Sequence, residues 1–160
     1  MDEGAFRIGI SWQAKAIGRS IPLELFRHFA RIPGVRLYSL QKLVGLDQLE
    51  RLKAELGIVD WSAEMDDGPD GFVDTAAVMA GMDLVVGCDS AVNHLAGALG
   101  CRAWLILKWF GDWRWMVGRE DSPWYPTLRI FRQRIKHDWD EVMARAAAEA
   151  AALVAGRRSG

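Results

Sequence analysis

Four polar side chains, Asp89, Ser90, Asn93 and His94, follow the apolar run at 82–86 within a stretch otherwise made of small and apolar residues. At the junction of a buried strand and a helix, such groups can serve two purposes. A hydroxyl or carboxylate can cap the first backbone N–H groups of the helix, which have no partner inside it. The same N–H groups, aided by the helix dipole, can instead bind an anion such as a phosphate. The residues alone favour neither interpretation over the other.

The flanking sequence predicts the elements that position these groups. Apolar runs and period-two alternation indicate strands, and apolar residues at helical spacing indicate helices between them. Strands that alternate with helices are typical of right-handed βαβ crossovers and a parallel sheet covered on both faces. We therefore expect one α/β domain over residues 1–160, with an ordered core at about 7–155: a doubly wound, Rossmann-like parallel sheet of about six strands. The predicted strands are 7–12, 35–40, 58–61, 82–86, 102–107 and 128–132, and the predicted helices are 22–31, 47–56, 74–80, 90–99 and 138–155.

Composition excludes several classes of function. A formal net charge of −1, with basic residues spread along the chain, gives no reason to expect nucleic-acid binding. No segment is long and apolar enough for a membrane span, and residues 1–4 do not resemble a secretory signal. Cys88 and Cys101 are too few for a disulfide framework or a metal site, so we expect two buried free thiols in a cytoplasmic protein.

Two loops carry further candidate groups. The loop at 62–71 holds Asp66, Asp67 and Asp70 in a turn-rich context, which favours solvated carboxylates over metal ligands. The loop at about 108–127 is rich in tryptophan, which indicates either a small second core or a surface that binds flat rings.

In the tryptophan-rich loop, Trp115 and Trp124 are expected to anchor the loop in such a core. Trp113 and Arg114 have two possible roles. They can pack within the loop, or they can stack on the base of a ligand and position an anion beside it.

The stretch DTAAVMAGMDLVVGCDSAVNHLAGALG, residues 74–100, resembles the donor-binding half of GT-B glycosyltransferases of the heptosyltransferase (family 9) type. In that family a strand ends in Asp-Thr/Ser and runs into a helix that carries His-Leu-Ala. The sequence is still more similar to glycosyltransferase domains that follow tetratricopeptide repeats in bacteria. The resemblance covers about residues 7–155 and includes RSIPLELF (19–26), YSLQK (38–42), DWRW (112–115), DSPWYPTLRIFRQ (121–133) and Asp138-Trp139.

The resemblance implies a nucleotide-sugar site at the start of the helix at 90–99. Asp89, Ser90 and the backbone of Ala91 and Val92 would hold the diphosphate or the sugar, and His94 would support that geometry. For His94, an equally good alternative is a buried hydrogen bond that orients a loop.

The resemblance also assigns roles around this helix start. Lys15 and Arg19 would neutralise phosphate charge, although both also suit an ordinary solvated loop. Ser39 and Gln41, at the end of the second strand, would read the base or the ribose. Asp74 and Thr75 are expected to cap their own helix, and an approach of Thr75 to the nucleotide is the alternative.

Glycosyl transfer by this family generally uses helix dipoles and cationic side chains in place of a metal ion, so neither metal nor cofactor is expected. The acceptor and its general base usually belong to a first domain, which this chain lacks. We therefore expect a donor domain that acts within a complete two-domain protein. The alternative is a non-catalytic remnant that works through self-association or another protein contact. A NAD-dependent dehydrogenase is disfavoured, because GISWQ at 9–13 stands where a glycine-rich phosphate loop would be.

Overall fold

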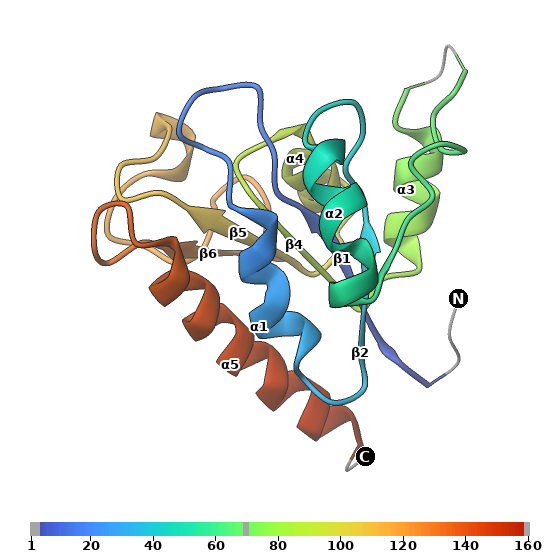
Figure 1. The fold of residues 1–160 in the computed structure, drawn as a ribbon. Helices are drawn as coiled ribbons and strands as arrows, with labels where there is room; N and C mark the ends of the chain where they lie inside the picture. Colours follow the sequence, from blue (N-terminus) through green and yellow to red (C-terminus); the bar gives the residue numbers. More distant parts are fainter. Residues whose placement is uncertain (1–3, 69–70, 159–160) are drawn as a thin grey trace.

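Six parallel strands form one sheet in the order β3-β2-β1-β4-β5-β6 (Figure 1). The computed structural model describes residues 4–68 and 71–158. The doubly wound α/β architecture expected from the sequence is confirmed. The strands are β1 (Phe6–Ser11), β2 (Val35–Ser39), β3 (Ile58–Val59), β4 (Leu84–Gly87), β5 (Ala103–Leu107) and β6 (Leu128–Arg132).

Helices connect the strands, with some departures from the expected bounds. The segment expected as one helix at 22–31 is a 3₁₀ turn, η1, followed by the single-turn α1, and a second 3₁₀ turn, η2, lies inside the tryptophan-rich loop. The edge strand β3 has only two residues. The helices are η1 (Leu23–Phe26), α1 (Arg27–Ala30), α2 (Leu46–Leu56), α3 (Val73–Ala80), α4 (Ala91–Ala98), η2 (Trp113–Trp115) and α5 (Trp139–Arg158).

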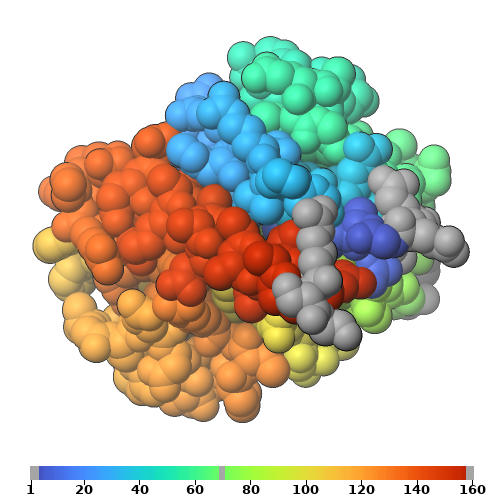
Figure 2. Space-filling view, turned by 90° about the horizontal axis from the view of Figure 1, so that it is seen from below, coloured from blue at the N-terminus to red at the C-terminus, as the bar shows by residue number. Residues whose placement is uncertain are grey.

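The sheet separates two apolar layers, because side chains along a strand point alternately to opposite faces. Ile8, Ile10 and Val86 face the layer formed with α1, α2 and α5, whereas Val85 faces the layer formed with α3 and α4. Figure 2 shows α5, in red, lying across the molecule between the N-terminal segments in blue and the chain from about 110 to 137 in orange.

The strand order reverses its direction of winding between β1 and β4, which lie side by side with Ser11 opposite Gly87. A β-carbon at Gly87 would lie 2.3 Å from the Ser11 hydroxyl, so the two strands approach here as only glycine allows. In open α/β sheets, ligands bind in the crevice beyond the carboxyl ends of the strands at such a switch point. The polar stretch after β4 lies at this crevice.

The two cysteines are free thiols, as expected, but only Cys88 is buried, and Cys101 is half-buried. Burial raises the pKa of the Cys88 thiol to about 12, which leaves it protonated and unreactive. No helix within the described residues has the length and apolar character needed to cross a membrane.

Candidate ligand-binding site

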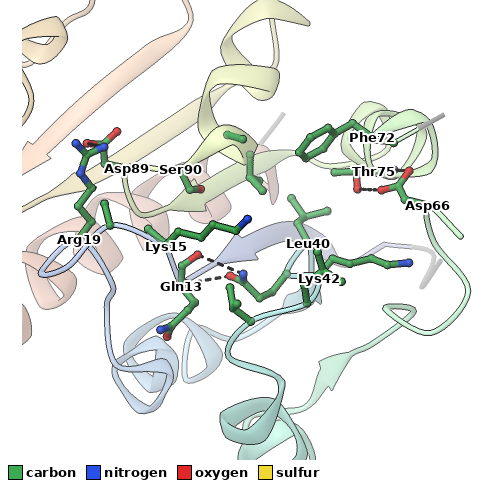
Figure 3. Close-up of a pocket in the computed structure, with 18 residues that line it drawn as sticks. Gln13, Lys15, Arg19, Leu40, Lys42, Asp66, Phe72, Thr75, Asp89 and Ser90 are labelled. Carbon is green, nitrogen blue, oxygen red and sulfur yellow. Dashed lines mark hydrogen bonds and ion pairs between the residues drawn. The ribbon is translucent and has the colours of Figure 1, made fainter. Parts of the chain in front are cut away.

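A cavity of about 600 Å³ opens at the carboxyl ends of β1, β2 and β4 (Figure 3). Leu40 and Val92 contribute apolar side chains to its lining, and Phe72 lies at one end of it. Of the eleven site residues expected from the sequence, the cavity brings together seven, and four lie outside its lining. The seven are Lys15, Arg19, Gln41, Asp89, Ser90, Ala91 and Val92, and the four are Ser39, His94, Trp113 and Arg114.

The start of α4 faces this cavity through Ser90, Ala91 and Val92. Ser90 occupies the N-cap position with extended backbone, φ −145° and ψ 170°, but no side chain makes a capping hydrogen bond to α4. The expectation that Ser90 or Asp89 caps this helix is therefore wrong. Without a side-chain cap, the first N–H groups of α4 are available to an acceptor in the cavity.

Asp89 uses its carboxylate inside the protein. Its Oδ1 accepts a hydrogen bond of 2.9 Å from the indole Nε1 of Trp115, and its Oδ2 lies 2.9 Å from Arg19 Nη1. Arg19 also pairs with Asp112, at 3.1 Å. Asp89 is only 4% exposed, and its carboxylate links the end of β4 to the segments that carry Arg19 and Trp115. Arg19, expected as a phosphate ligand, has its charge balanced by two carboxylates.

Gln41 is a structural clamp at the end of β1. Its Oε1 accepts hydrogen bonds from the backbone N–H groups of Trp12 and Gln13, and its Nε2 donates to the Gln13 carbonyl. Ser39, expected beside it in the crevice, is fully buried. The amide group of Gln41 therefore shapes the cavity wall, and most of its hydrogen-bonding capacity is taken up by the backbone of Trp12 and Gln13.

Two lysines line the cavity, and only one of them is engaged. Lys42 donates to the Met65 carbonyl and lies 3.8 Å from an Asp67 carboxylate oxygen. Lys15 is exposed, makes no ion pair with any described residue, and extends into the cavity between the Arg19–Asp89 pair and the end near Phe72 (Figure 3). Leu43, Val44 and Phe72 were not predicted as site residues, because loop residues without a motif carry no positional signal, and Lys42 was noted only as part of the YSLQK motif.

The expectation that Asp66 is a solvated turn residue is wrong. Rather than being solvated, its carboxylate accepts hydrogen bonds from the backbone N–H of Asp74 and from the backbone N–H and hydroxyl of Thr75. Burial alone would raise the pKa of Asp66, but these hydrogen bonds lower it below its ordinary value. Asp66 thus caps α3 from outside the helix, and Asp74 and Thr75 do not cap it. Asp70 lies outside the described residues, and no metal-binding cluster occurs among the others.

His94 belongs to an aromatic cluster beneath the tryptophan-rich loop. Its Nδ1 lies 3.0 Å from the Tyr125 hydroxyl, and its ring stacks on Trp115 with centroids 5.1 Å apart. Burial lowers the pKa of His94, which keeps the ring neutral. Tyr125 in turn lies against Gly97 of α4. This geometry fits the alternative role of His94, the orientation of a loop, and it also confirms that Trp115 is core.

The exposed part of the same loop is built differently. The Arg114 guanidinium lies 4.9 Å from the centre of the Trp113 ring and pairs with Asp112 at 2.8 Å. Trp124 is 54% exposed and donates its indole N–H to the Arg114 carbonyl, so the expectation that Trp124 is a core residue is wrong.

The strand order, with its switch point between β1 and β4 and the crevice beyond it, defines a Rossmann-like α/β architecture. Solved structures share it. Escherichia coli heptosyltransferase WaaC, in complex with ADP-2-deoxy-2-fluoro heptose, matches 97% of this chain and 44% of its own, with TM-score 0.61 and 14% identity. Escherichia coli ADP-heptose LPS heptosyltransferase II matches 99% of this chain and 49% of its own, with TM-score 0.65 and 15% identity. At such identities the likeness establishes the fold.

A curated relative is more similar in sequence. Protein FlbA of Caulobacter vibrioides is 31% identical over 147 residues, which are 88% of this chain and 24% of FlbA. The chain therefore spans about a quarter of that relative and about half of the heptosyltransferases. No family model matches the chain.

Proposed function

We propose that this chain is the donor-binding domain of a GT-B glycosyltransferase, which binds a nucleoside-diphosphate sugar in the cavity between β1, β2 and β4. The observation that carries the proposal is the start of α4. It faces the cavity without a side-chain cap, and the unpaired Lys15 extends into the same space. The heptosyltransferase fold, solved in WaaC with ADP and with an ADP-sugar, supports it.

The chemistry asked of this site is the stabilisation of a leaving diphosphate. Negative charge grows on that group as the glycosidic bond to the sugar breaks, and fixed N–H dipoles and a cation stabilise it most effectively where water is excluded. The N–H groups at Ala91 and Val92 supply the dipoles, and Lys15 supplies the cation. Asp89 and Arg19 act as positioning residues, because their ion pair ties the loop that carries Lys15 to the end of β4.

In this proposal the domain works within a longer polypeptide that supplies the acceptor site and the general base. FlbA, of which the chain matches 24%, supports such a context. The link to tetratricopeptide repeats belongs to the same proposal, and sequencing of the reading frame on both sides of these residues tests it. We place the reaction in the cytoplasm, where the free thiol of Cys88 would persist.

Thermal unfolding with UDP, GDP, ADP and CMP and their sugars tests donor binding. A ligand at about 100 times its dissociation constant adds about 2.7 kcal/mol to the free energy of unfolding, or about 5–10 °C in Tm for a domain of this size. We expect one base to give such a shift. If no nucleotide raises Tm at millimolar concentration, the proposal fails.

The variant Lys15→Ser locates the site. We expect it to weaken nucleotide binding about 10-fold, as measured by calorimetry, because it removes one cation from the diphosphate. Tm without ligand should not change, since Lys15 makes no ion pair with any residue that the structure describes. Lys136→Ser, at an exposed lysine that does not line the cavity, is the matched control. Equal affinities in the two variants would move the nucleotide away from α4.

A protein-interaction module is the second candidate function, and the exposed apolar side chains around the cavity favour it. Leu43 is 78% exposed, Phe72 46% and Val44 36%, and all three line the cavity. Apolar residues grouped in this way mark contact surfaces. Sedimentation tests this second candidate, which predicts that the Leu43→Ser variant or a bound nucleotide reduces self-association. If self-association persists in Leu43→Ser and does not change when nucleotides are added, the contact surface does not lie at the cavity rim.

A further inference from the structure

A second cavity, of about 430 Å³, lies beyond the carboxyl end of β6 and shares no lining residue with the cavity at α4. In Figure 1 the gold and orange segments that form it lie at the opposite end of the sheet from α3. Arginine dominates its lining. The side chains that matter here are Trp109, Arg119, Arg132, Gln133, Arg134 and Arg145.

Gln133 places an unpaired donor in this cavity. Its Oε1 accepts a hydrogen bond of 3.0 Å from the Trp109 backbone N–H, which fixes the orientation of the amide group. The Nε2 is then left without a hydrogen-bond partner among the described residues, although the side chain is only 3% exposed. Buried amide donors are nearly always satisfied in folded proteins, so the partner of this one, a water molecule or a ligand, has to come from outside the described residues.

Two of the arginines carry charge that no carboxylate balances at close range. Arg119 pairs with Asp121 at 2.6 Å, and Arg145 pairs with Glu141 at 2.9 Å. Glu120, the acidic residue of the lining, pairs with an arginine outside it, at 3.0 Å. The two that remain are Arg132 and Arg134.

Arg132 is half-buried, and its guanidinium donates hydrogen bonds to the carbonyls of Trp115 and Met116. Burial lowers the pKa of Arg132, because the guanidinium loses hydration without gaining an anionic partner. Arg134 is exposed. Its charge helps to lower the pKa of Glu141, but it forms no salt bridge within the described chain. The cavity therefore combines an uncompensated cation with a buried N–H donor.

We propose that this second cavity binds the oxyanion of a small molecule, a phosphate or a carboxylate, between Arg132, Arg134 and the Gln133 amide. A guanidinium fork matches either oxyanion, and a charge-assisted hydrogen bond from the amide would complete the set. Trp109 lines the rim and is 47% exposed, so a planar group next to the oxyanion can stack on it. The site does not depend on the proposed donor site.

Site-resolved NMR titration with phenyl phosphate tests the proposal, with sodium chloride added to keep ionic strength constant. We expect saturable shifts of the Gln133 side-chain NH₂ and the Arg132 Nε–H resonances at millimolar concentration. Inorganic phosphate should bind a few-fold more weakly, because it cannot stack on Trp109. Benzoate in place of phenyl phosphate distinguishes a carboxylate site from a phosphate site.

Variants separate this cavity from the one at α4. Arg134→Ser should weaken binding at least about 5-fold, whereas Arg102→Ser, at an exposed arginine outside the cavity, should leave it unchanged. Gln133→Glu keeps the acceptor for Trp109 but replaces the donor by a negative charge, so it should abolish binding while the Trp109 amide shift reports an intact fold. No saturable shift at Gln133, or equal affinity in Arg134→Ser and Arg102→Ser, overturns the proposal. Shifts confined to Ala91 and Val92 would overturn it as well, while supporting the donor site.

Discussion

Asp89 and Trp115 are joined by a buried hydrogen bond of 2.9 Å, although 26 residues separate them in the chain. The bond attaches the tryptophan-rich loop to the end of β4, next to the start of α4. Through its other oxygen, Asp89 also holds Arg19. One carboxylate therefore sets the position of two loops around the candidate site.

Replacing Asp89 should damage stability before it damages binding. Asp89→Ala leaves the buried Trp115 indole N–H without an acceptor and removes one of the two carboxylates that balance Arg19. We expect a loss of about 2–4 kcal/mol in the free energy of unfolding, and so a fall of about 6–12 °C in Tm. Asp89→Asn, which keeps an acceptor for the indole, should lose less. Equal losses in the two variants would show that the Trp115 bond contributes little.

The capping role of Asp66 is testable against its neighbour. Asp66→Ala removes the acceptor for the first N–H groups of α3 and should lower the free energy of unfolding by about 1 kcal/mol. Hydrogen exchange should rise first in the opening turn of α3. Asp67→Ala, at a side chain 84% exposed, should change stability by less than about 0.5 kcal/mol. If both variants behave alike, the cap is not formed in solution.

Two helical glycines should respond in opposite ways to the same substitution. A β-carbon at Gly97 would lie 2.4 Å from Tyr125, so Gly97→Ala must displace the ring that hydrogen-bonds His94, and we expect a loss of about 1–3 kcal/mol. Gly156 in α5 has open space around it, and Gly156→Ala should gain about 0.5–1 kcal/mol from helix propensity. Chemical denaturation measures both. A neutral Gly97→Ala would mean that Tyr125 packs elsewhere.

The half-buried imidazole of His94 predicts a pH dependence of stability. Burial lowers the pKa of His94 below 6.5 in the folded protein, with further charge effects from nearby groups. As the pH falls through about 6.5, the unfolded chain binds a proton before the folded chain does, so the free energy of unfolding decreases. The nearby charged groups are Asp89, Asp112, Arg19 and Arg114.

His94→Gln removes this proton uptake and retains a partner for the Tyr125 hydroxyl. Its Tm should therefore fall less steeply than that of the parent protein between neutral pH and about pH 5. Parallel Tm–pH curves for the two proteins would show that His94 titrates normally in the folded state.

The general architecture was predictable because it rests on local patterns. Apolar runs at β4 and β5, and their alternation with helices, indicated the sheet, and the structure confirms each predicted strand. It was also predictable that the polar groups in the turn after β4 lie at the crevice, because a strand that ends at a switch point opens onto it.

The roles of individual side chains were less accessible. Asp66 looked like a solvated turn residue, yet it caps α3, because a loop folds it back over eight residues. Trp115 and Trp124 stand in the same tryptophan-rich loop, yet the first is buried and the second is 54% exposed. Nothing in the local sequence distinguishes them, since the difference depends on which one meets α4.

The sequence by itself determined the period of each element and hence the doubly wound sheet, because backbone geometry and apolar burial act over a few neighbouring residues. Only the tertiary structure decided that Asp89 turns inward to Trp115 and Arg19 and that Lys15 keeps a charge free in the cavity. Those outcomes depend on partners brought together across the chain, where burial and charge compensation, rather than spacing, determine which polar group meets which.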